Sequence, residues 1–216
     1  MSNPVLRKRI LFSLVLLAAY AGGAMAWTRS PLTGMRPPME GTPLTQAYVW
    51  YDGERQNTVW LDPQVVAEFN PGESGQHAAV KADAGAKELP LRHPQAGIRL
   101  WQMNNTGNAA VSGMAGSNPG GKYSPVFHDG PNSNSAMRAL PGNVIVQLDP
   151  AWSEGKVRAW FGSHQLQMIR KINAGVNVYL IKTSPGMATL EVANALYQGG
   201  EVKAAYPDWW QEVVTK

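Results

Sequence analysis

The sequence predicts an α+β protein whose last third is a four-stranded antiparallel sheet with two helices on one face. Strand-like and helix-like segments follow one another in the order βαββαβ between residues 140 and 208. Apolar residues recur at period two in the strands and at helical spacing in the helices, and Gly, Pro and Asn mark the junctions. Right-handed crossovers arrange this order as a ferredoxin-like sandwich, preceded here by a β-hairpin-containing region and long loops.

The βαββαβ segment opens with a strand in which Val144, Val146 and Leu148 share one face. Asp149-Pro150 predicts the start of a helix, because Asp caps helix N-termini and Pro is preferred at the first helical position. Gly199-Gly200 ends the second helix. The predicted elements are strand 143–148, helix 151–164, strands 166–172 and 176–183, helix 187–198 and strand 202–206.

The preceding region, residues 46–103, is predicted to be rich in β-structure. Asp52-Gly53 is typical of a hairpin turn between two aromatic, β-branched runs. Asp62-Pro63 predicts the start of a short piece, 64–69, that is either helical or extended. Residues 73–95 show no periodicity. The three predicted strands are 47–51, 58–61 and 98–103.

Three further segments are predicted to be irregular. Residues 27–45 are rich in Pro, Gly and Thr and are expected to form an extended leader. Residues 104–139 are rich in Gly, Asn and Ser, which is typical of a long loop or of a region that orders only against a partner. Residues 209–216 follow the last predicted strand and are called the tail below.

The N-terminus is typical of a secretory signal peptide. Arg7-Lys8-Arg9 is followed by an apolar run, Ile10 to Ala21, and then by Gly22-Gly23. Ala24 and Ala26 supply the small residues of a signal-peptidase site, so cleavage is expected after Ala26 and the signal segment is residues 1–26. The alternative is an uncleaved anchor, although the run is shorter than the ~20 residues that span a bilayer. The mature protein is expected in the periplasm or outside the cell.

Composition excludes several classes of function. The chain has 216 residues and no Cys, which excludes disulfide scaffolds, thiol nucleophiles and Cys-based metal sites. Its formal net charge is +4, and loss of Arg7, Lys8 and Arg9 with the signal peptide lowers this to +1. The remaining basic residues form no cluster dense enough to follow a phosphate backbone, so no nucleic-acid partner is expected.

The sequence gives no positive indication of catalysis, a metal or a cofactor. The four histidines (His77, His93, His128 and His164) stand in unrelated contexts and without metal-ligand spacing, so structural roles are expected. Asp129, Asn132 and Asn134 could offer oxygens to calcium, but the EF-hand pattern is not met. Phosphate-binding glycine motifs are missing as well. We therefore expect a protein that is not an enzyme.

The tryptophans are expected mainly in the core. Trp152 and Trp160 share a helical stripe with Lys156, and Trp50 and Trp60 could form a cross-strand pair on the hairpin.

Trp209 and Trp210 differ, because adjacent residues of an extended segment point to opposite sides. Either both indoles pack within the protein, or one seals the domain while the other meets a partner.

Three stretches together resemble the proregion of secreted bacterial subtilisin-family serine proteases. They are Leu140-Pro141-Gly142 opening a strand and helix, strand 176–183 followed by Pro185-Gly186 and a helix, and the ending Tyr206-Pro207-Asp208-Trp209-Trp210-Gln211-Glu212. Asp208 stands where the family more often has Asn. The catalytic motifs Asp-Thr/Ser-Gly, His-Gly-Thr and Gly-Thr-Ser-Met-Ala do not occur, and the chain stops at Lys216, so the resemblance is to a proregion without its enzyme.

The resemblance implies a secreted, stand-alone, propeptide-like protein. In such proregions the open face of the sheet packs against the protease, and the tail lies in the substrate cleft as an extended strand. The protein would inhibit a subtilisin-family protease, assist its folding, or both, and a carboxylate at Lys216 would resemble a cleaved product. The residues expected to contact this partner are Trp209, Trp210, Gln211, Glu212, Val213, Val214, Thr215 and Lys216.

Two alternatives remain at this stage. The chain could be a periplasmic or surface assembly module that reuses the proregion fold, with the hairpin and the segment 104–134 docking onto another component. It could also be an orphaned proregion, separated from its protease half.

Overall fold

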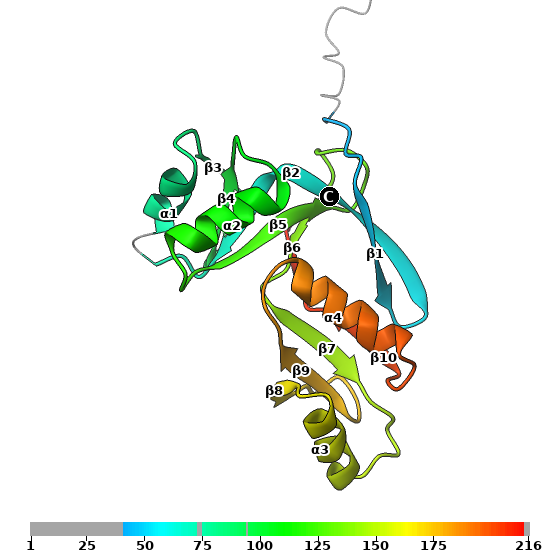
Figure 1. Ribbon diagram of the computed structural model, residues 1–216. Coiled ribbons are helices and arrows are strands. Elements are labelled where there is room, and N and C mark those ends of the chain that lie inside the picture. Colours follow the sequence, from blue (N-terminus) through cyan, green and yellow to red (C-terminus); the bar gives the residue numbers. More distant parts are fainter. Residues whose placement is uncertain (1–40, 73–74, 94, 214–216) are drawn as a thin grey trace, which may run out of the picture. The chain divides into compact units, whose positions relative to one another are not determined.

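A computed structural model describes residues 41–72, 75–93 and 95–213. The predicted signal peptide with Ala24 and Ala26, most of the predicted leader, and Val214, Thr215 and Lys216 lie outside the described residues. The described chain forms two antiparallel sheets with helices packed on one face of each (Figure 1). The protein is therefore α+β, as predicted.

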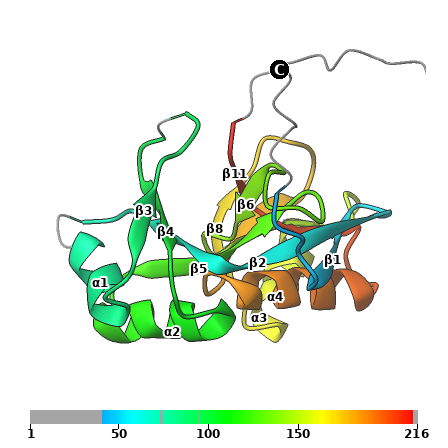
Figure 2. The ribbon, with the colours of Figure 1, turned by 90° about the horizontal axis from the view of Figure 1, so that it is seen from above.

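The first sheet has seven strands and contains most of the N-terminal half. Its order is β11-β6-β5-β2-β4-β3, with β1 pairing to the free part of β2. Helices α1 and α2 lie side by side on one face (Figure 2). The elements are β1 Ala47–Asp52, β2 Arg55–Phe69, α1 Gly75–Ala82, β3 Lys87–Leu89, β4 Ile98–Gln102, α2 Gly107–Ser117, β5 Lys122–His128, β6 Met137–Ala139 and β11 Trp210–Gln211.

Strand β2 organises this sheet, because it pairs with β1 over its first half and with β4 and β5 beyond. The β1–β2 hairpin turns at Gly53, whose φ of 58° favours glycine. The predicted piece 64–69 is extended rather than helical, and a register shift between Asp62 and Val66 accommodates Pro63. The predicted Trp50–Trp60 pair is wrong: the register places Trp50 opposite Asn57.

The prediction of a loop over residues 104–139 is also wrong. This segment contains α2, β5 and β6, and every residue of β5 except Lys122 is buried. Similarly, the aperiodic segment 73–95 contains α1 and β3. The small residues that suggested a loop instead allow close packing: a Cβ placed on Gly113 of α2 would lie 3.4 Å from Cβ of Ala82 in α1. Tertiary packing here outweighs weak helix propensity.

The second sheet confirms the ferredoxin-like prediction. Its four strands have the order β10-β7-β9-β8 and are antiparallel throughout, and α3 and α4 share one buried cluster on one face. This is the arrangement that the βαββαβ order predicts. The elements are β7 Asn143–Gln147, α3 Glu154–Ser163, β8 Gln167–Lys171, β9 Val178–Lys182, α4 Met187–Gln198 and β10 Ala204–Pro207.

Helix α3 begins later than predicted. Asp149 does not cap it; its carboxylate accepts a hydrogen bond from the Ala151 amide (2.9 Å) and closes a turn. Ser153 is the N-cap, and its hydroxyl oxygen accepts from the Lys156 amide at 3.4 Å. Trp152 therefore precedes the helix, where the Lys156 ammonium lies 4.1 Å from its ring centroid.

A shared cluster joins the first sheet to helix α4, which packs on the second sheet. It brings Leu61 of β2, Phe127 of β5 and Leu140 together with Leu190 of α4. The Asn194 amide of α4 also donates to the Val49 carbonyl of β1 at 2.8 Å. Among the described residues, no helix has the length and apolar character needed to cross a membrane.

Candidate functional site

The tail, which carries the predicted partner-binding residues, is bound to the first sheet as far as Glu212. Trp210 and Gln211 form β11 and pair with Ala139 and Arg138 of β6 (Figure 2). The Glu212 amide then donates to the Met137 carbonyl at 2.9 Å. Val213 is half exposed, and Val214 to Lys216 lie outside the described residues.

Trp209 and Trp210 point to opposite sides, as their adjacency predicts, and both pack within the protein. Trp210 contacts the buried cluster of β2, β4 and β5, and its Nε1 donates to Gln95. Trp209 contacts the cluster that joins the sheets, with its ring centroid 5.6 Å from that of Phe127 and 5.7 Å from that of Trp50. The Nε1 of Trp209 is buried and has no acceptor among the described residues.

Glu212 is buried, with 2% of its surface exposed. Its Oε1 accepts from the Arg92 amide at 3.2 Å, and its Oε2 lies 3.7 Å from Nε of the Arg92 guanidinium. That same Oε2 has no hydrogen-bond donor in the part of the chain that is described. Arg92 also donates to the Asn134 carbonyl at 3.1 Å, so one side chain holds both the tail and the loop before β6.

The second sheet offers a separate surface, because no helix among the described residues packs on one of its faces. Cross-strand pairing aligns Tyr206, Ile145, Leu180 and Arg170 in one row on that face. We call this row the open face. Leu180 is almost fully buried between its neighbours, Ile145 and Tyr206 are half-buried, and Arg170 is exposed. The row is apolar at its centre and basic at one end.

Tyr206 remains a neutral phenol on this face. Burial raises its pKa above the ordinary value, and the carboxylates of Asp52 and Asp208 raise it further. The hydroxyl is therefore available as a hydrogen-bond donor across the physiological pH range.

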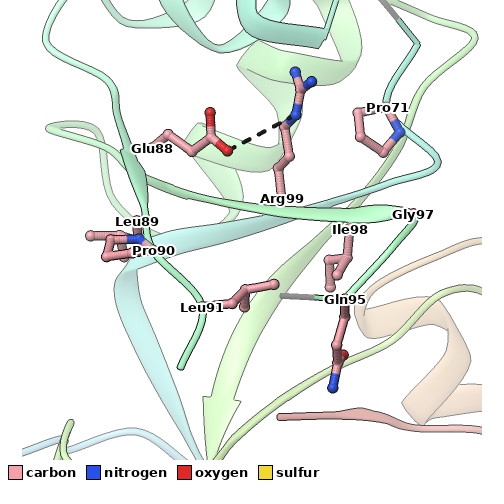
Figure 3. A pocket seen from close by; sticks show the side chains of 9 residues that line it. All are labelled: Pro71, Glu88, Leu89, Pro90, Leu91, Gln95, Gly97, Ile98 and Arg99. Atoms are coloured by element: carbon pink, nitrogen blue, oxygen red, sulfur yellow. Dashed lines mark ion pairs between the residues drawn. The ribbon is translucent and has the colours of Figure 1, made fainter. Parts of the chain in front are cut away.

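A cavity of about 740 Å³ opens beside β3 and β4 (Figure 3). Leu91, Ile98 and Gln95 lie on one side of the strand, whereas Glu88 and Arg99 lie on the other and form an ion pair of 4.0 Å. The cavity adjoins the tail because Gln95 accepts from Trp210. Its lining is mostly apolar and brings no set of reactive groups together.

His128 lies between two hydrogen-bond acceptors in the first sheet. It is buried, its Nδ1 faces the Ser135 carbonyl at 3.0 Å, and its Nε2 faces a carboxylate oxygen of Asp62 at 3.1 Å. The Ser124 hydroxyl donates elsewhere, to the Pro125 carbonyl.

His164 lies close to both a serine and a carboxylate, but the arrangement suits a helix end rather than a nucleophile. Nδ1 lies 3.1 Å from the Ser163 hydroxyl, and Nε2 lies 3.5 Å from Glu201. Both the hydroxyl and Nδ1 are also within hydrogen-bond distance of the Trp160 carbonyl. These groups stand at the C-terminus of α3, whose dipole disfavours the negative charge of an acyl-transfer intermediate.

The other two histidines are placed as follows. His93 is half-buried in the loop between β3 and β4, and the side chain of His77 lies outside the described residues.

The contacts of the loop 129–134 do not support the hypothesis that this loop binds calcium. The Asp129 carboxylate is paired with the Arg138 guanidinium. Within the described ranges, no group of three or more His, Asp or Glu side chains could hold a metal ion.

Asp83 is a polar residue that sequence reasoning missed. Its carboxylate accepts from the amides of Gly85, Asn104 and Asn105, and it ties the end of α1 to the start of the α2 segment. These hydrogen bonds, that from Gly85 foremost, hold its pKa below the ordinary value, against the opposing effect of burial. The pairing of Glu212 with Arg92 could not be predicted from the sequence either, because 120 residues separate the two.

Comparison with known proteins adds little to this geometry. No family model and no curated protein matches the sequence. Among solved structures, a protein described as a candidate glycine cleavage system transcriptional repressor is 12% identical, with 68% of this chain and 96% of that chain covered at a TM-score of 0.19. A TM-score this low carries no argument about function.

Proposed function

We propose that this chain is a secreted, propeptide-like protein that binds a subtilisin-family serine protease, as an inhibitor, a folding assistant or both. The observation that carries the proposal is the ferredoxin-like sheet with its open face, from which β10 leads directly into Asp208-Trp209-Trp210. The ferredoxin-like sheet and the segment that follows it are the two features in which this chain resembles the proregions.

The chemistry of the open face supports a protein partner. Ile145, Leu180 and Tyr206 offer an apolar centre with a phenol donor, and Arg170 offers a charge at the border. A buried apolar centre with a polar rim is the usual composition of a protein interface.

The proposal requires that the tail can leave the first sheet. Trp210 to Glu212 are bound to β6, and Glu212 is also bound to the loop that carries Arg92, so these residues reach a substrate cleft only after leaving the first sheet. Without that change, Val213 is the one described residue of the tail that lies beyond these contacts.

The first experiment is a titration of residues 27–216 into a panel of subtilisin-family proteases, with peptide hydrolysis as the readout. We expect tight inhibition that relaxes slowly as the chain is digested. A folded, undigested chain that inhibits no protease on the panel would contradict the proposal.

A matched pair of charge reversals tests the open face. Arg170→Glu reverses a charge on that face, whereas Arg158→Glu makes the same change on an exposed position of α3, on the helix side. We expect the first variant to inhibit at least roughly tenfold less tightly, because like charges oppose docking, and the second to match the wild type. Equal effects of the two variants would exclude the open face.

An assembly module is the second candidate, and the bound tail favours it. If the tail serves only to complete the first sheet, as its pairing with β6 suggests, the chain could bind a partner through the β1–β2 hairpin instead. Loss of binding to such a partner on changing the hairpin, without any protease inhibition by the parent chain, would support this reading.

A further inference from the structure

The tail covers the outer edge of the first sheet. Strand β6 borders the sheet, and its only described strand partner on that side is β11. The ladder is short: two residue pairs, followed by the hydrogen bond from Glu212 to Met137. The backbone groups used here are the same ones that an extended segment would offer to a substrate cleft.

Arg92 fixes the end of this ladder. Its guanidinium lies beside a Glu212 carboxylate that is almost completely excluded from solvent, while 48% of the Arg92 side chain is exposed. A buried carboxylate that loses its cationic partner is strongly disfavoured. The bound position of the tail therefore depends on an arginine that a partner or solvent can reach.

Two features oppose the bound position. The Trp209 Nε1 and the Glu212 Oε2 are both buried without a hydrogen-bond partner among the described residues. Each polar atom recovers hydrogen bonds with water once the tail detaches. The tail thus combines a short backbone ladder with two buried polar atoms that lack hydrogen bonds, and these features favour its exchange between two positions.

We infer that Arg92 and β6 form a latch, and that the tail alternates between β6 and the substrate cleft of a protease. The two positions are mutually exclusive because both use the backbone of Trp210 to Glu212. This inference rests on the proposed function. In the free protein only the unlatched fraction is competent, and the apparent affinity is lowered by that fraction.

A reversible lock tests the latch in one molecule. Gln211 and Arg138 are directly opposed in the β11–β6 ladder, and the sequence contains no cysteine. The double variant Gln211→Cys/Arg138→Cys therefore places a unique disulfide across the ladder. We expect the oxidised form to inhibit at least roughly tenfold less tightly than the same protein after reduction, because the disulfide removes the unlatched fraction.

An opposite variant opens the latch. Arg92→Ala leaves Glu212 buried without its cation, whereas Arg99→Ala removes a partly exposed arginine whose ion-pair partner is Glu88 instead of the tail. A spin label on Val213→Cys reports the tail without any protease. We expect faster label motion in Arg92→Ala and unchanged motion in Arg99→Ala. Arg92→Ala should inhibit roughly tenfold more tightly than the unmodified protein. The gain in affinity cannot exceed the factor by which latching weakens binding in the unmodified protein.

The outcomes separate the latch from the proposed function. If Arg92→Ala frees the label but no form inhibits, the proposed function is wrong and the pairing with β6 is purely structural. If the oxidised and reduced forms inhibit equally, the latch is wrong and the tail is not exchanged. If Arg92→Ala forms dimers in sedimentation analysis, the released tail pairs with a second copy, which overturns the protease as its alternative partner.

Discussion

Single residues with several hydrogen-bond partners hold the irregular parts of this protein. Asp83, His128 and Arg92 each join segments far apart in the sequence: the end of α1 to the α2 segment, β2 to the loop after β5, and the β3–β4 loop to the tail. The sequence shows the residue types but not their partners, since nothing in local periodicity encodes a contact across tens of residues. This is why the pairs Asp62–His128 and Arg92–Glu212 could not be predicted.

The lowered pKa of Asp83 predicts acid sensitivity. A carboxyl group whose pKa is lower in the folded than in the unfolded chain stabilises the fold above its unfolded value, about 3.9, and this contribution is lost as pH falls through the folded value. Asp83→Asn should be less stable than wild type at pH 7, and the difference should shrink towards pH 3. Urea unfolding at both pH values measures this. Glu88→Gln, an exposed carboxylate, should change little at either pH.

At the scale of elements, the sequence predicts the second sheet far better than the first. The second sheet is built from local βα and ββ units whose apolar periods are intact, so the order βαββαβ could be derived directly. In the first sheet, β5 is buried on both faces and contains a serine and a proline, and α2 is made largely of Gly, Ala and Ser. Their regular structure comes from packing against β2 and α1, which no local pattern reveals.

The start of α3 provides a test at this scale. Ser153→Ala removes the observed cap and should destabilise the protein by about 0.5 kcal/mol, at the low end for N-caps because the bond is long and exposed. Pro150→Ala alters the position that the sequence wrongly marked as the first helical turn. It should leave α3 intact, as measured by amide exchange across Lys156 to Trp160. Equal effects on α3 from both variants would contradict the observed boundary.

At the scale of the whole molecule, the predicted segment boundaries after residues 103, 139 and 208 do not divide the described residues into independent hydrophobic cores. Leu140 and Leu190 belong to one buried cluster with β2 and β5, and the tail returns from the second sheet to the first. The two sheets are therefore expected to unfold together rather than as separate domains.

Leu190→Ala tests this coupling. Leu190 is 2% exposed, and truncating it in a tightly packed cluster should cost about 2–5 kcal/mol. Amide exchange should accelerate in both β5 and β9, because the cluster joins β5 to α4 and α4 packs on the second sheet. Leu196→Ala, in a side chain that packs only against the cluster of the second sheet, is the matched control and should affect β9 more than β5. Acceleration confined to β9 in the Leu190→Ala protein would show that the sheets unfold independently.

The position of β11 has a consequence for the fate of the protein under digestion. A sheet edge stripped of its last strand exposes a row of unpaired amides and carbonyls, which is a template for association with other chains. Proteolysis that removes residues 209–216 would strip β6 in this way and would also uncover the apolar cluster beneath Trp210. The truncated protein should therefore self-associate through the exposed edge of β6. We expect digestion to end in aggregation instead of releasing a soluble domain.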